Sequence, residues 1–125
     1  MKKTVETNKA PAAVGPYSQA VWVGDTLYCS GQIGIDPAIG KLVEGGVEMQ
    51  TAQIFRNIAA VLDAAGLSFD NVVKTAAFLT DINDYAVVNE AYKANFTADF
   101  PARSAVAVSA LPAGALVEIE VIATR

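Results

Sequence analysis

The segment 116–124 carries apolar side chains on both faces of the strand that it predicts, and this restricts the fold more than any other feature. Successive side chains of a strand point to opposite faces of a sheet. One face of this strand holds Val117, Ile119 and Val121. The other face holds Leu116 and Ile122 beside two carboxylates. A sheet built around such a strand needs an apolar cover on each side.

Helical periodicity occurs in two segments. Residues 46–65 repeat apolar side chains at three- and four-residue steps, and Gly66 follows where a helix-terminating glycine is preferred. A second stripe follows the cap-forming residues 81–84 and consists of Tyr85, Val88, Tyr92 and Phe96. Strand-like segments are 20–23, 26–29, 71–80, 104–109 and 116–124. This order predicts a single α+β domain, residues 1–125, with a mixed sheet.

Two helices can cover only one face of such a sheet. The segment 104–109 repeats the two-faced pattern, with valines on one side and alanines on the other. A third layer within the monomer would require more than the 125 residues of the chain. We therefore expect a homo-oligomer in which sheets of different subunits pack together.

The absence of histidine excludes every catalytic system and metal site that depends on an imidazole. No Ser-His-Asp or Cys-His system can form, and neither can a metal site with histidine ligands. The single cysteine, Cys29, excludes a four-cysteine zinc site and predicts a cytoplasmic protein. The net charge of −4 argues against nucleic-acid binding. No apolar run reaches the roughly 18 residues that a membrane span requires.

Arg103 is the only arginine between residues 74 and 118, and it opens an otherwise apolar strand. A guanidinium in this position is partly desolvated and requires an acidic partner. A hairpin that turns near Pro112 would bring Glu118 close to it. One interpretation is a structural ion pair at a sheet edge or subunit contact. The other is a site in which arginine binds a substrate carboxylate and glutamate positions water.

Four further positions have a structural and a functional interpretation. Ser30 and Gly31 end a strand. The structural interpretation of the glycine is a turn at the strand end, and the functional interpretation is that it exposes backbone N–H groups to a ligand. Tyr17 follows a Gly-Pro turn and is either a packing or a site tyrosine. Asn89 lies off the apolar stripe of its helix, which predicts a solvated position.

Four blocks of the sequence are informative when they are taken together. Residues 10–19 read Ala-Pro-Ala-Ala-Val-Gly-Pro-Tyr-Ser-Gln, and residues 30–33 read Ser-Gly-Gln-Ile. Residues 100–104 read Phe-Pro-Ala-Arg-Ser, and residues 117–120 read Val-Glu-Ile-Glu. With these blocks the chain resembles the RidA (YjgF) family of reactive intermediate deaminases over essentially its whole length.

The resemblance implies a chorismate-mutase-like α+β fold with two helices on one face of the sheet. It implies a homotrimer with active sites in the clefts between subunits. It also implies 2-iminobutanoate/2-iminopropanoate deaminase activity, the hydrolysis of 2-imino acids and their enamine tautomers to 2-oxo acids and ammonia. Pyridoxal-phosphate dehydratases acting on serine or threonine release such intermediates. The resemblance implies no cofactor and no metal.

The resemblance also assigns roles to residues. Arg103 matches the carboxylate-binding arginine of the family, and Glu118 matches the glutamate that orients or activates water. Tyr17, Ser30 with Gly31, and Asn89 fall on positions that line the cleft. Ala105 replaces a frequent cysteine, which leaves only its backbone N–H for a substrate contact.

Two other functions compete with this interpretation. The same cleft could serve a non-catalytic regulator that binds 2-oxo acids. An endoribonuclease or translation inhibitor is the other alternative, against which the acidic charge and the missing histidine argue.

Overall fold

A computed structural model describes residues 1–97 and 99–125, and these form a six-stranded mixed sheet with two α-helices. The strands run in the order β1 (Lys2–Val5), β2 (Ala20–Val23), β3 (Thr26–Cys29), β8 (Val117–Thr124), β6 (Val72–Leu79) and β7 (Ala102–Ala107). A separate small hairpin consists of β4 (Ile35–Asp36) and β5 (Lys41–Leu42). The helices are α1 (Gly46–Ala64) and α2 (Tyr85–Asn95). Short 3₁₀ turns occupy Phe69–Asn71, Ile82–Asp84 and Pro112–Gly114.

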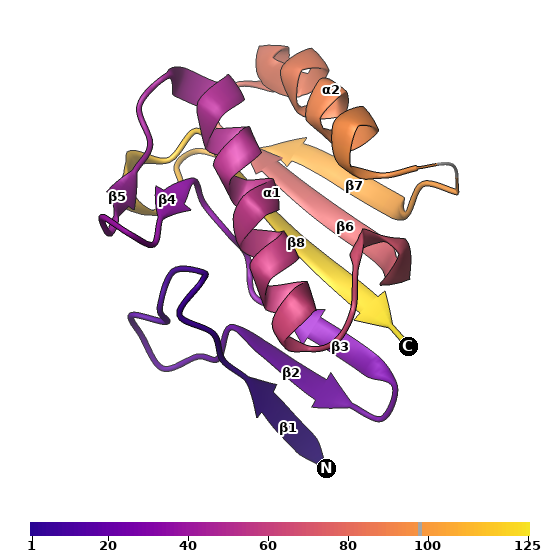
Figure 1. The fold of residues 1–125 in the computed structure, drawn as a ribbon. Coiled ribbons are helices and arrows are strands. Elements are labelled where there is room, and N and C mark those ends of the chain that lie inside the picture. Colours follow the sequence, from indigo (N-terminus) through magenta and orange to yellow (C-terminus); the bar gives the residue numbers. More distant parts are fainter. Residues whose placement is uncertain (98) are drawn as a thin grey trace.

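Both helices lie on the same face of the sheet, as the sequence predicted (Figure 1). Their apolar sides and the helix-facing side chains of the strands form the core. Its fully buried members include Leu27, Ile54, Ile58, Leu62, Leu79, Val117, Ile119 and Val121. Within the described residues, neither helix combines the length and apolar character that a bilayer crossing demands.

The ends of α1 follow the expected glycine rules. Gly45 precedes the helix with a φ of 109°, and Gly66 follows it with a φ of 77°, a backbone region that other residues rarely adopt. The backbone N–H of Leu67 donates to the carbonyl of Leu62 at 2.9 Å, which closes the helix with a Schellman-type turn. The predicted end at Gly66 is therefore confirmed.

The pairing of the last two strands differs from the sequence prediction. β7 pairs in parallel with β6, and β6 pairs antiparallel with β8, so that β6 lies between β7 and β8. The expected hairpin near Pro112 is wrong because β6, α2 and β7 form a crossover unit, and such a unit sets its two strands in parallel. β1 and the small hairpin were not predicted, since their segments are short and polar.

The register separates the two residues that the hairpin was expected to join. Arg103 pairs with Thr75, which is buried beneath the helices, so the arginine lies on the helix-covered face. Glu118 pairs with Phe78, which precedes the buried Leu79 and lies on the opposite face. In one chain, Arg103 and Glu118 therefore occupy opposite faces of the sheet.

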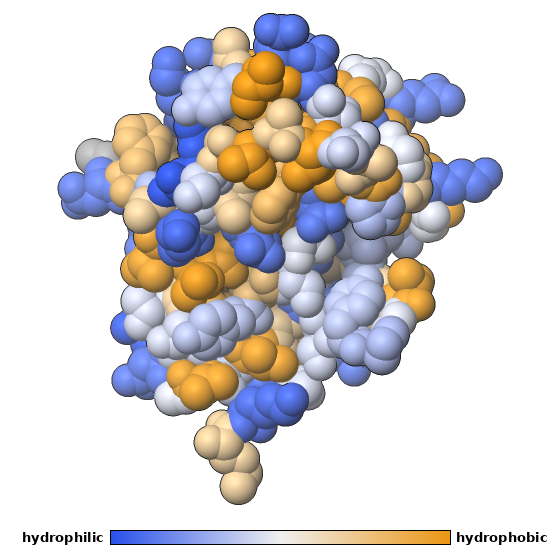
Figure 2. Space-filling view, turned by 180° about the vertical axis from the view of Figure 1, so that it is seen from behind, coloured by the Kyte–Doolittle hydropathy of each residue, from blue (hydrophilic) through white to orange (hydrophobic). Residues whose placement is uncertain are grey.

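The uncovered face of the sheet carries apolar side chains, as its strands predicted. Figure 2 looks onto this side of the molecule and shows apolar residues scattered among polar ones. From the strand pairing, this face includes Val21, Tyr28, Phe78, Val106 and Ile122, together with the two glutamates of β8. Tyr28 and Val106 each remain 47% exposed. Both α-helices of the described residues lie on the other face, so neither covers this apolar surface.

Candidate active site

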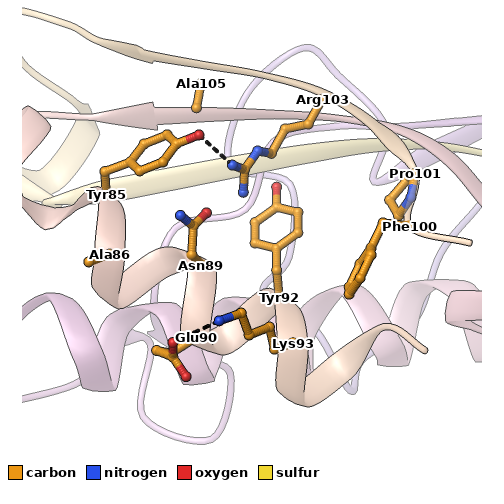
Figure 3. Close-up of a pocket in the computed structure, with 10 residues that line it drawn as sticks. All are labelled: Tyr85, Ala86, Asn89, Glu90, Tyr92, Lys93, Phe100, Pro101, Arg103 and Ala105. Carbon is orange, nitrogen blue, oxygen red and sulfur yellow. Dashed lines mark hydrogen bonds and ion pairs between the residues drawn. The ribbon is translucent and has the colours of Figure 1, made fainter. Parts of the chain in front are cut away.

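A cavity of about 700 Å³ lies between α2 and the edge strand β7 (Figure 3). Its lining includes Tyr85, Asn89, Tyr92, Phe100, Arg103 and Ala105. The parallel pairing of β6 and β7 places alternate residues of β7 under α2. Arg103 and Ala105 therefore both face this cavity, and Asn89 enters it from the helix instead of taking the solvated position that its spacing predicted.

The guanidinium of Arg103 is held by aromatic groups. Its Nη2 donates a hydrogen bond to the Tyr85 hydroxyl at 2.8 Å. Its central carbon lies 4.6 Å from the ring centroid of Tyr92 and 5.1 Å from that of Tyr85. Both distances are within the range of cation–π attraction. Two tyrosines thus fix the position of the charge without neutralising it.

No acidic side chain of the described residues forms a salt bridge with Arg103. The expected internal ion pair with Glu118 is therefore wrong for the single chain. Lys93 and Glu90, which line the rim of the same cavity, pair with each other at 3.2 Å and remain largely exposed. Arg103 is thus left as a half-buried cation that can bind an external anion.

A second cavity, of about 870 Å³, lies next to Glu118. The segment 11–19, the segment 30–37 and the turn before β8 surround it, and Tyr17, Ser30, Gly31, Gln32, Glu118 and Glu120 are among its lining residues. Burial raises the pKa of the Glu118 carboxyl above its ordinary value, and the nearby charge of Glu120 raises it further. This carboxylate is consequently a stronger base than an exposed glutamate.

Gly31 is required by the close approach of Glu118. A Cβ atom on Gly31 would lie 2.9 Å from the Cδ atom of Glu118, well inside normal contact. The neighbouring Gln32 forms a two-way backbone pair with Ile119, at 2.8 Å and 3.1 Å. This pair fixes the strand end against β8, so the glycine leaves the space that the carboxylate occupies.

The walls of the second cavity are held by buried polar groups. The Oγ of Ser30 donates to the carbonyl of Ser18 at 2.6 Å, so this hydroxyl joins two lining segments. The Gln19 amide, which is buried, donates to the carbonyl of Pro11 at 2.8 Å. On the other side, Asn57 of α1 donates to the carbonyl of Ile35 at 2.9 Å. The loops around Glu118 are therefore fixed from several directions.

The predicted site residues thus fall into two groups. Arg103, Asn89 and Ala105 line the first cavity. Tyr17, Ser30, Gly31 and Glu118 line the second. We call these the Arg103 cavity and the Glu118 cavity. Each contains part of the predicted site, and neither of these two cavities is lined by both Arg103 and Glu118.

Sequence reasoning missed Tyr85 and Tyr92 as site residues. Their spacing assigned them to the apolar stripe of α2, and Tyr92 is indeed 5% exposed. The sequence did contain one signal for a role beyond packing. Both residues are tyrosines and not phenylalanines, and a tyrosine hydroxyl on a buried stripe usually has a hydrogen-bond partner.

Cys29 behaves as the small hydrophobic residue that the sequence predicted. Its thiol is partly buried, and this burial raises its pKa to about 12. It is therefore protonated and a poor nucleophile at neutral pH. Across the described residues, no cluster of three or more cysteine or acidic side chains is suitable for holding a metal ion.

Comparison with known proteins gives consistent results. The family described as Endoribonuclease L-PSP matches residues 7–125. A mouse protein named 2-iminobutanoate/2-iminopropanoate deaminase is 53% identical over 125 residues, which cover 100% of this chain and 93% of the mouse protein.

Solved structures agree with the sequence matches. The crystal structure of RidA from the Antarctic bacterium Psychrobacter superposes with a TM-score of 0.95 at 53% identity, covering 98% of this chain and 99% of that one. A Rid family protein of Yersinia pestis gives a TM-score of 0.97 at 54% identity over all of both chains. Fold, sequence blocks and full-length identity together show that this chain belongs to the RidA (YjgF) family.

Proposed function

We propose that this protein hydrolyses 2-imino acids, such as 2-iminobutanoate and 2-iminopropanoate, to 2-oxo acids and ammonia. The observation that carries the proposal is the Arg103 guanidinium, which two tyrosines hold in a cavity and which forms no salt bridge with a carboxylate of residues 1–97 or 99–125. Such a group suits a small organic anion. The mouse relative that is 53% identical bears the name of this deaminase, which supports the same substrate class.

The chemistry follows from the two groups that the site offers. Arg103 binds the substrate carboxylate through two N–H groups and so fixes the adjacent C=N carbon. Glu118 holds a water molecule near that carbon and accepts its proton as the C–O bond forms. When the imine nitrogen is already protonated, Glu118 returns this proton to the nitrogen of the resulting carbinolamine. The C–N bond then breaks, ammonia leaves, and the C=O bond forms as the hydroxyl proton passes to Glu118. This hydrolysis contains no redox step. Orientation of the substrate, together with general acid–base catalysis that raises the rate by about 10²–10⁴-fold, accounts for the proposed acceleration.

The complete site requires a second chain in this proposal. Arg103 and Glu118 lie on opposite faces of the sheet, in different cavities. We propose a chorismate-mutase-like homotrimer in which the Arg103 cavity of one subunit meets the Glu118 cavity of its neighbour. The apolar side chains on the uncovered sheet face support such an assembly, because packing of sheets would remove them from water.

The test is ammonia release from 2-iminobutanoate, generated in the assay by a threonine dehydratase. The wild-type protein should accelerate release well above the spontaneous rate, and Glu118→Ala should abolish that acceleration. If wild-type protein binds 2-oxobutanoate without any turnover, it is a metabolite-binding regulator instead. Cleavage of RNA that persists in the Arg103→Ala and Glu118→Ala variants would indicate a nuclease site elsewhere or a contaminant.

The pH dependence gives a further prediction. Glu118 must be ionised to accept a proton, so activity falls as the pH drops through its raised pKa. Glu120→Gln removes a negative charge that raises this pKa, so the acidic limb of kcat/KM should move to lower pH. Glu48→Gln makes the same charge change on an exposed position of α1 and should not move the limb. An unshifted limb in Glu120→Gln would contradict this role of Glu118.

The contact between Gly31 and Glu118 gives another prediction. Gly31→Ala pushes the carboxylate away from its position, and a displacement near 1 Å in a catalytic group costs about 10²-fold in rate. We expect kcat to fall by about this factor while the melting temperature changes little, since only a side chain must move. Glu118→Asp shortens the acid and should be less harmful in the Gly31→Ala background than alone. Simple additivity of the two effects would show that they do not act on each other.

A further inference from the structure

The Arg103 cavity contains a second polar group that is aimed at an anion. Resting on the proposed function, we propose that Tyr85 binds the substrate carboxylate together with Arg103 and positions the guanidinium for it. Its hydroxyl accepts a hydrogen bond from the arginine and donates its own proton to a carboxylate oxygen. Tyr85 is thus a substrate-binding residue that α2 contributes.

The direction of the Tyr85 proton follows from the chemistry of its partner. Arg103 Nη2 lies 2.8 Å from the Tyr85 hydroxyl oxygen. A guanidinium has only donors, so the hydroxyl must be the acceptor in this contact. The O–H bond of the tyrosine is then free to point elsewhere. Among the described residues, no protein acceptor takes this proton.

The position of Tyr85 directs that proton into the cavity. It is the first residue of α2 and is 42% exposed, and its ring lines the cavity beside Asn89. Figure 3 shows the tyrosine reaching from the helix towards Arg103, with the Asn89 amide directed to the same space. A carboxylate at the guanidinium is therefore within reach of a third donor.

Tyr92 shows the contrasting case on the same helix. Its hydroxyl donates to the Oγ1 of Thr75 at 2.9 Å, and both residues are buried. That proton is already used inside the protein, so Tyr92 offers only its ring to Arg103. Of the two tyrosines that contact the guanidinium, Tyr85 alone has a hydroxyl available to a ligand.

The fixed guanidinium is the second consequence of this contact. One N–H of Nη2 is directed at the tyrosine, which limits rotation of the side chain about its long axis. The remaining donors are then presented to the cavity in a defined orientation, and less side-chain entropy is lost when a carboxylate binds. Tyr85 therefore acts both directly and through Arg103.

Tyr85→Phe tests the inference because it removes the oxygen and retains the ring. Loss of a hydrogen bond to a charged ligand should raise KM for 2-iminobutanoate about tenfold and change kcat much less. The Kd for 2-oxobutanoate, measured by calorimetry on the intact oligomer, should rise by a similar factor. Thr97→Val is the control, since it also removes an exposed hydroxyl near α2 but Thr97 lines neither cavity, and it should behave as wild type.

A neutral ligand separates anion binding from a general structural effect. 2-Oxobutanamide lacks the carboxylate, so its inhibition constant should be the same for Tyr85→Phe and wild type. Unchanged KM and Kd in Tyr85→Phe, or equal weakening of the acid and the amide, would overturn the role of Tyr85. The deaminase proposal fails separately, through absence of turnover in the wild-type protein, and the 2-oxobutanoate measurement still decides the role of Tyr85 in that case.

Discussion

Arg103→Lys is expected to lower kcat/KM for 2-iminobutanoate by about 10²–10³-fold, although the positive charge is kept. A lysine ammonium is a single point charge and cannot present two parallel N–H groups to a carboxylate. It also loses the planar contact with Tyr92, whose ring lies 4.6 Å from the guanidinium carbon. Arg103→Ala should be worse still, because it removes the charge as well.

The loss in Arg103→Lys should be specific to the site. Arg56→Lys is a suitable control, since Arg56 is exposed on α1 and hydrogen-bonds only to Gln53 of its own helix. That variant should retain wild-type kinetics. Steady-state ammonia release and size-exclusion chromatography would be measured for each variant. An Arg103→Ala protein that keeps its oligomeric state and wild-type turnover would refute the proposed mechanism.

Mixed oligomers of Arg103→Ala and Glu118→Ala subunits should recover activity that neither variant has alone. If each site takes its arginine from one subunit and its glutamate from the next, some sites in a mixed trimer receive both native residues. Random assembly from equal amounts restores about one site in four over the whole mixture, and each purified mixed trimer has about one complete site in three and thus about a third of wild-type activity. The effect is large because the parent variants are nearly inactive.

Co-expression with two different affinity tags would isolate the mixed trimers. A mixture of Arg103→Ala with the Arg103→Ala/Glu118→Ala double variant is the control, because no subunit in it supplies the arginine. It should stay inactive. If the first mixture is also inactive while its subunits demonstrably exchange, the shared site is refuted and each chain must complete its site in another way.

The sequence predicted the local structure better than the pairing of strands. The periodicity of α1 and the glycine that ends it gave its limits closely, because these signals depend only on neighbouring residues. The alternation in 116–124 identified the buried face of β8 for the same reason. The position of β6 between β7 and β8 could not be deduced from the sequence. Two strands joined by a short turn usually form a hairpin, but here β7 pairs with β6 as part of a β6–α2–β7 crossover unit.

The candidate site shows the same division. The residues Arg103 and Glu118 were selected by type and by resemblance, but their separation onto two faces depends on the pairing that was missed. The pairing of Arg103 with Glu118 of the same chain was wrong, and the rings of Tyr85 and Tyr92 contact the guanidinium there instead. Tyr85 was hidden because its helical spacing is that of a core residue, and only the structure shows its hydroxyl at the arginine.

The crossover from β6 through α2 to β7 gathers the Arg103 cavity, the proposed anion-binding half of the site, into one continuous stretch, residues 72–107. The Glu118 cavity, where the proposed mechanism holds water, is formed mainly by the N-terminal loops and by β8. Each half thus has its own stretches of sequence, and the two meet along β6 and β8, where Phe78 pairs with Glu118. If the two proposed roles hold, substitutions on α2 and β7 that leave β6 unchanged should alter which acids are bound while the contacts around Glu118 are kept.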